Sequence, residues 1–162
     1  MNTLLPAIVV CLPLLLTQAA ASDDDVAKGN DVKFELHNGH FQRNDAGLKG
    51  NSSYLVFTDR KAFDEVFGIA RVIGKQNFVP KDAFDKKMVV AVIKRGNAIS
   101  EYKTEKVTTD EATLFVQFTA KMGPPGTATF ASPLIVSVNR EKYEAVVFIE
   151  NGKKIETVKL GK

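Results

Sequence analysis

The two histidines of the chain, His37 and His40, are the residues whose type and spacing come nearest to a reactive site. They lie three residues apart in His37-Asn38-Gly39-His40, where two imidazoles could contribute to a metal site. A stable zinc site needs three or four protein ligands, and no cysteine or carboxylate motif accompanies this pair. We therefore interpret the quartet as a turn at the end of a strand, and we predict no metal ion and no cofactor.

The patterns of nucleophilic and phosphate chemistry are missing from the sequence. Cys11, the single cysteine, lies in an apolar leader, and no serine has the strand–Gly-x-Ser-x-Gly–helix context of a hydrolase. The loop from Gly123 to Gly126 is rich in glycine, but its prolines lack the N–H groups that would hold a phosphate. The sequence predicts that the protein is not an enzyme.

Two loops are the candidate binding site. One joins the apolar stretch at residues 88–93 to the next predicted strand, and the other contains a proline pair that lowers the entropy cost of holding the loop ready to bind. The loops either present a binding surface or only connect strands. The candidate binding residues are Asn97, Ala98, Ile99, Ser100 and Tyr102 from the first loop and Gly123, Pro124, Pro125 and Gly126 from the second.

Strands must position these loops, because apolar and polar residues alternate along most of the chain. Residues 88–93 are continuously apolar and predict a central strand covered on both faces. Residues 102–108 predict a more exposed strand, whose edge is a second candidate binding surface. The other predicted strands are 32–37, 54–58, 113–119, 134–138, 145–150 and 154–160.

One helix and one tight turn complete the prediction. Asp59 can cap a helix of about three turns, in which Phe63, Val66, Phe67 and Ala70 form one apolar stripe. Asn151-Gly152 predicts a type I′ turn joining the last two strands. The expected fold is mainly β (α+β), an antiparallel sheet rolled or sandwiched over a Phe-rich core, with one packed helix.

The beginning of the chain resembles an export signal. Residues 4–16 are almost wholly apolar but too few to span a membrane, and Ala19-x-Ala21 is a pattern that signal peptidase accepts. We predict a signal peptide over 1–21 cut between Ala21 and Ser22, a disordered acidic tether over 22–31 and a single β-rich domain over 32–162. The alternative for the leader is a buried N-terminal helix, because it carries no lysine or arginine.

Composition narrows the class of partner. The net charge is only +3, and the basic pairs, such as Lys86-Lys87, are interleaved with acids or separated by apolar strands. This pattern is typical of a solvated surface and predicts no nucleic-acid partner. After cleavage the domain would have no cysteine and no membrane attachment.

Between Tyr54 and Val147 the chain resembles the C-terminal domain of the PrcB-like protease-complex family. Residues 83–92, AFDKKMVVAV, resemble the family's DF-x-x-x-x-VVAV strand entry, and residues 130–136, FASPLIV, resemble its T-S-P-Y-x-x-V strand. Residues 96–102 fall where the family has a Gly-rich loop ending in Tyr, although Ser100 and Glu101 replace its two glycines. The resemblance implies an exported accessory domain that binds and stabilises a protease or another partner.

The expected function is therefore a secreted or periplasmic, non-catalytic protein-interaction domain with a protein partner. The alternative is a protease-inhibitor-like or small-ligand-binding β domain, in which the Pro124-Pro125 loop would enter an active-site cleft.

Overall fold

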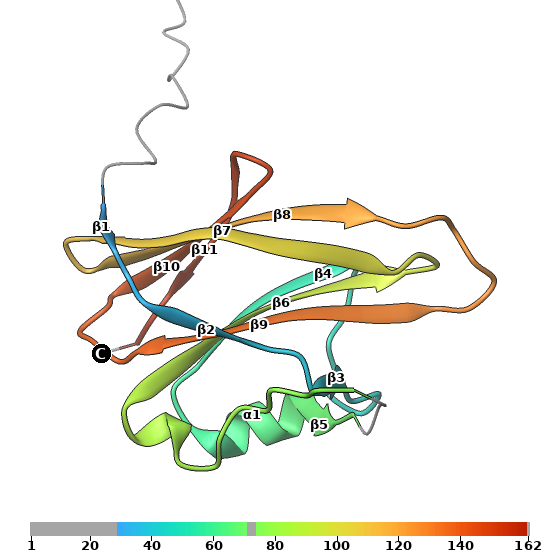
Figure 1. Ribbon diagram of the computed structural model, residues 1–162, viewed down its shortest axis with the longest axis horizontal. Helices are drawn as coiled ribbons and strands as arrows, with labels where there is room; N and C mark the ends of the chain where they lie inside the picture. The colour runs from blue at the N-terminus through green and yellow to red at the C-terminus, as the bar shows by residue number, and fades with distance from the viewer. Residues whose placement is uncertain (1–28, 71–73, 162) are drawn as a thin grey trace, which may run out of the picture.

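The computed structural model describes residues 29–70 and 74–161, so the predicted signal peptide and its cut lie outside the described residues. Within that part, strands build two large sheets and a small one (Figure 1). The larger sheets have the orders β1-β7-β8-β10-β11 and β2-β9-β6-β4, and β3 pairs with β5. The strands are β1 Asn30–Asp31, β2 Phe34–His37, β3 His40–Gln42, β4 Ser52–Phe57, β5 Phe67–Ile69, β6 Lys87–Gly96, β7 Ser100–Asp110, β8 Thr113–Met122, β9 Phe130–Asn139, β10 Ala145–Glu150 and β11 Lys153–Lys159.

The prediction of a mainly β fold with antiparallel sheets is confirmed, with one parallel exception. β8 and β10 run parallel, from Ala145 opposite Thr113 to Glu150 opposite Phe118. This pairing arises because β9, the strand between them in the chain, lies in the other large sheet. In the described part of the chain, no helix is long and apolar enough to cross a membrane.

The central strand predicted over 88–93 is confirmed as β6, whose side chains are buried on both faces. Met88, Val90 and Val92 join a cluster that contains Phe118 and Phe148 of the other large sheet. The alternate residues Val89, Ala91 and Ile93 join a second cluster beneath the helix. Most of the buried phenylalanines gather in this second cluster, which holds Phe57, Phe63, Phe67 and Phe84.

The predicted helix is shorter than its apolar stripe suggested. Asp59 caps it as expected, accepting a hydrogen bond of 2.9 Å from the Ala62 amide, but α1 spans only Arg60–Val66. Phe67 has extended backbone and begins β5, whose next residue is Gly68. Val66 is β-branched and Gly68 has no side chain, and both are poor helix formers. The pairing of β5 with β3 provides the backbone hydrogen bonds that a third helical turn would otherwise have made.

The beginning of the domain differs from its prediction in detail. The tether predicted to reach residue 31 ends earlier, because Asn30 and Asp31 pair with Thr109 and Thr108 of β7. In β2, Leu36 is exposed and His37 is buried. Leu36 shares a face with Phe34, which packs against the first cluster, but lies where the edge strand leaves that cluster uncovered, whereas His37 lies opposite Ile135 of the second cluster.

The last hairpin follows its prediction. β10 and β11 are joined by Asn151 and Gly152, which both have positive φ, 51° and 78°. A type I′ turn requires this conformation at both central residues, so the turn prediction is confirmed.

Candidate functional site

The two candidate loops lie against each other at one end of the large sheets (Figure 1). The Gly123 amide donates a hydrogen bond of 2.9 Å to the Ile99 carbonyl, and the Gly126 amide donates one of 2.6 Å to the Asn97 carbonyl. Segments more than twenty residues apart thus form one structural unit. We call residues 97–99 and 122–129 the loop tip.

Sheet topology brings the loops together. β6 and β9 are neighbours in one large sheet, and β7 and β8 are neighbours in the other. The connections β6–β7 and β8–β9 both cross from one sheet to the other, and antiparallel pairing places both crossings at the same end. The chain between residues 96 and 130 therefore folds back on itself as a long two-stranded arm, from Gly96 opposite Phe130 onward.

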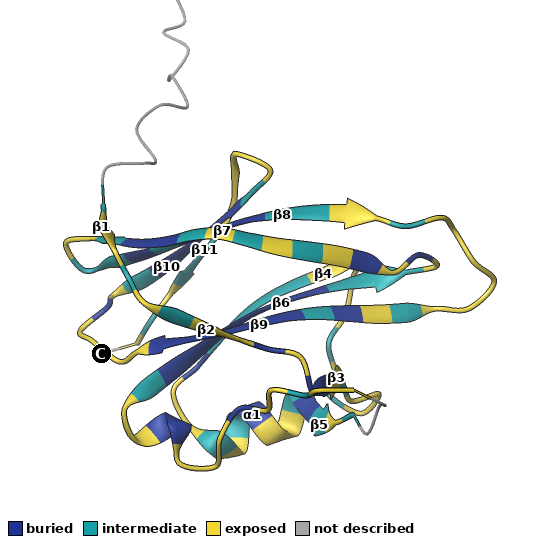
Figure 2. Cartoon of the chain, in the orientation of Figure 1, coloured by how far each residue is buried: buried dark blue, intermediate teal, exposed yellow. Residues whose placement is uncertain are grey.

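The candidate binding residues divide into two groups by exposure (Figure 2). Five are exposed, namely Asn97, Ile99, Pro124, Pro125 and Gly126, and these can touch a partner. Ala98 and Ser100 are buried, while Tyr102 and Gly123 are half-buried. The second group therefore supports the tip and does not form its surface.

Ser132 holds the first loop in place. Its hydroxyl oxygen accepts a hydrogen bond of 2.9 Å from the Ser100 amide, and its carbonyl accepts one of 2.8 Å from the Tyr102 hydroxyl. Burial raises the pKa of Tyr102 well above its usual range, so the phenol stays protonated and remains a donor. Both bonds join β7 to β9 of the other large sheet, which fixes where the first loop ends and β7 begins.

Sequence reasoning left one exposed apolar residue out of the site. Met122 is 65% exposed and ends β8, and Ile99 is 53% exposed. Ile99 adjoins Ser100, which is the register partner of Met122, so both apolar side chains belong to the same end of the arm. The available signal was an apolar residue directly before the Gly-Pro-Pro turn, where a strand ends and a side chain loses its neighbours.

The alternative surface, the edge of β7, is protected against strand addition. Among the described residues, β1 pairs with Thr108 and Thr109, and the Val32 amide donates to the Val107 carbonyl, so residues 100–106 form the part of this edge without a neighbouring strand. Lys103 and Glu105 are exposed there, and a register shift lies between Thr104 and Lys106. Charges and bulges on an edge strand discourage another strand from pairing with it.

The histidines do not converge on a common point. His37 Nε2 lies 2.9 Å from the Ser137 hydroxyl, whereas His40 Nε2 accepts a hydrogen bond of 3.1 Å from the Val79 amide. Each ring therefore has its own partner on a different element. Across residues 29–70 and 74–161, no group of three histidine, cysteine, aspartate or glutamate side chains could hold a metal ion.

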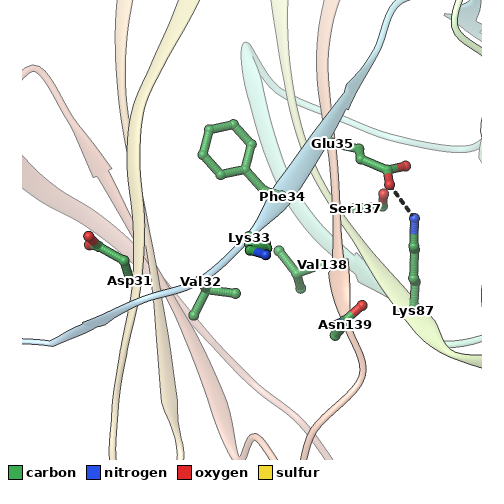
Figure 3. A pocket seen from close by; sticks show the side chains of 9 residues that line it. All are labelled: Asp31, Val32, Lys33, Phe34, Glu35, Lys87, Ser137, Val138 and Asn139. Atoms are coloured by element: carbon green, nitrogen blue, oxygen red, sulfur yellow. Dashed lines mark hydrogen bonds and ion pairs between the residues drawn. The ribbon is translucent and has the colours of Figure 1, made fainter.

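Two surface grooves each contain an ion pair. The first, of about 690 Å³, runs along residues 31–35 and the end of β9 (Figure 3). In it Lys87 and Glu35 face each other in an ion pair of 2.7 Å, and this contact lowers the pKa of Glu35. The second, of about 870 Å³, lies beside α1, where Arg60 pairs with Asp64 at 2.8 Å.

Comparison of the chain with protein-family models, with curated proteins and with solved structures found no match.

Proposed function

We propose that this protein is an exported, non-catalytic domain that binds a protein partner through its loop tip. The observation that carries the proposal is that two backbone hydrogen bonds hold the loops together, while the side chains of Ile99 and Met122 remain exposed to solvent. Exposed apolar side chains on preorganised loops cost little entropy to immobilise, and methionine is enriched at protein interfaces.

The tip is a better candidate than the β7 edge because the two surfaces differ in what they expose. The edge carries alternating charges and a bulge, whereas the tip carries apolar side chains, two prolines and Asn97. Apolar residues with a polar rim are typical of a protein-binding surface. The two segments that resemble the PrcB-like family, residues 96–102 and 130–136, also meet here through Ser132.

Export and maturation belong to the same proposal. Cleavage between Ala21 and Ser22 would release a domain without cysteine into an extracellular or periplasmic compartment. Intact-mass measurement of exported material should give a chain that begins at Ser22. Exported protein that retains residues 1–21 would contradict this part of the proposal.

The binding experiment compares matched apolar positions. A photo-crosslinking amino acid is placed at Ile99, at Met122 or, as control, at Ile155 of β11, which is 46% exposed and lies outside the tip. The first two positions should crosslink one common partner in the native extracellular fraction, and the third should not. Ile99→Ser with Met122→Ser should then weaken the purified complex at least about tenfold, while Ile155→Ser leaves it unchanged.

Two outcomes would contradict the loop tip as the binding surface. One is equal crosslinking from Ile155, and the other is unchanged affinity of the double variant with a circular dichroism spectrum like the wild type. A separate assay addresses the protease-inhibitor alternative. Stoichiometric loss of serine- or cysteine-protease activity that Pro124→Ser with Pro125→Ser abolishes would assign the tip to inhibition.

A further inference from the structure

The turn His37-Asn38-Gly39-His40 holds a distant part of the chain, residues 77–79, against the second core cluster. Asn38 and Asn77 exchange two hydrogen bonds, one between their backbones at 3.1 Å and one from the Asn77 amide to the Asn38 side chain at 2.7 Å. The ring of Phe78 covers Gly39, whose hypothetical Cβ would lie 2.3 Å from it. Val79, 3% exposed, belongs to the second cluster.

His40 makes the contact that depends on protonation. Its Nε2 accepts the hydrogen bond of 3.1 Å from the Val79 amide, which requires a neutral ring with no proton on that nitrogen. The imidazole is 7% exposed and packs edge-to-face on Phe63 and Phe78, with ring centroids 5.1 and 5.7 Å away. A proton on Nε2 would place two donors face to face in an apolar setting.

His37 supports the same turn from the other side. It is 5% exposed, and its Nε2 lies 2.9 Å from the Ser137 hydroxyl of β9. Burial lowers the pKa of both imidazoles, so both are neutral near pH 7. The turn is thus held by two neutral rings.

Of the charged groups around the rings, Glu35 favours an imidazolium at His37 and Asp64 favours one at His40, but burial outweighs both. From α1, Arg60 and Asp64 face His40, but their charges pair with each other, and Arg60 also donates to the Val79 carbonyl at 3.3 Å. Near His37, Glu35 of β2 is paired with Lys87 of β6. β5 contributes Phe67, Gly68 and Ile69, and β9 contributes Ser137, all uncharged. Neither imidazole has a carboxylate as hydrogen-bond partner in the described residues.

We propose that His40, supported by His37, is an acid-sensitive contact whose protonation releases residues 77–79 while the two large sheets stay folded. Release of residues 77–79 would expose Val79 and the ring of Phe63, which is 0% exposed while the segment is in place. Acid would thus create an apolar surface beside α1, away from the loop tip.

Amide hydrogen exchange of the full mature domain, followed by NMR, tests this inference. After correction for intrinsic exchange, protection of the Val79 amide should fall roughly 10- to 30-fold between about pH 7.5 and about pH 5. It should also stay below the protection of the Val116 amide in the centre of β8, which reports opening of the whole fold. His40→Gln retains an acceptor for Val79 and removes the titration, so protection at Val79 should lose its acid dependence in this variant.

The proposal is overturned if the Val79 and Val116 amides exchange equally at every pH, because the segment then opens only when the whole domain unfolds. It is also overturned if His40→Gln shows the same acid response as the wild type. The imidazole signals of His37 and His40 give an independent readout. If His40 titrates while protection at Val79 stays constant, protonation does not release the segment.

Discussion

The hydroxyl of Tyr102 donates a hydrogen bond of 2.8 Å to the carbonyl of Ser132, which joins β7 of one large sheet to β9 of the other. The bond lies at the base of the loop tip, where the first loop leaves β6 and enters β7. It therefore links the stability of the domain to the position of the surface that we propose binds a partner.

Removing this hydroxyl should destabilise the domain. Tyr102→Phe should lower the free energy of unfolding by about 1 kcal/mol, because a half-buried hydrogen bond between sheets is lost while the ring stays packed. The matched control is Thr104→Val on the same strand, since the Thr104 hydroxyl is buried without a hydrogen-bond partner. Urea melts should show no loss for this control. Equal losses in both variants would mean that the Tyr102 hydrogen bond contributes nothing specific.

The ion pair between Lys94 and Glu150 also joins the two large sheets. Lys94 comes from β6 and Glu150 from β10, and their side chains are only 22% and 11% exposed. Lys94→Met alone should destabilise the domain by about 2 kcal/mol, because it leaves a poorly solvated carboxylate unpaired. Adding Glu150→Leu should restore much of that loss, and a double-mutant cycle of urea melts measures the coupling. Additive losses would show that the two charges do not interact.

The turn at Asn151-Gly152 depends on the backbone conformation of Gly152 and on the side-chain hydrogen bonds of Asn151. Gly152→Val should cost about 1–3 kcal/mol, because a β-branched residue tolerates φ of 78° poorly. Asn151→Gly retains the backbone conformation but removes two side-chain hydrogen bonds, in which Asn151 Oδ1 accepts from the Ala120 amide and Nδ2 donates to the Ala120 carbonyl. We expect it to cost about 0.5–1 kcal/mol in urea melts. Wild-type stability for Asn151→Gly would limit the role of Asn151 to its φ angle.

The stability of the whole domain should fall with acid in the range where histidine titrates. His37 and His40 are neutral in the fold, whereas in the unfolded chain they take up protons near pH 6.5. The free energy of unfolding should therefore be greatest above about pH 7.5 and decrease below about pH 6.5, by up to about 1.4 kcal/mol per pH unit for each histidine. Urea melts of the wild type and of His37→Gln with His40→Gln should differ in this slope. The same slope in both proteins would refute the assignment to these residues.

Zinc should not raise the melting temperature of the domain. His37 and His40 make separate contacts with Ser137 and Val79, and a tetrahedral site needs more ligands than this turn supplies. A saturating increase at micromolar zinc that His40→Ala abolishes would contradict this prediction.

The sequence predicted the elements whose patterns depend on near neighbours. Period-two alternation located most strands, continuous apolar character identified β6 as covered on both faces, and Asn151-Gly152 specified its turn. The apolar stripe on the helix failed at Phe67, because an extended segment can bury the same side chain once β3 offers hydrogen bonds. The spacing of apolar residues cannot show that a strand elsewhere in the chain will pair with this segment instead.

The candidate site, too, could be predicted only where near neighbours in the sequence determine it. Local patterns identified both loops, since each follows a predicted strand and contains glycine. They could not show that Ala98 and Ser100 point inward, because their burial depends on Ser132 and the opposite sheet. The roles of His37 and His40 likewise depend on Ser137 and Val79, which lie far along the chain.

The parallel pairing of β8 with β10 has a consequence for how the chain reaches its fold. β10 and β11 can form a hairpin locally around Asn151-Gly152, but this hairpin finds its place only after β9 has crossed into the other sheet. Non-local parallel contacts of this kind form late, because loop closure must precede them. Until β10 docks, the edge of β8 that it covers would stay unpaired, and an unpaired strand edge is a template for aggregation, so docking of the final hairpin also protects β8.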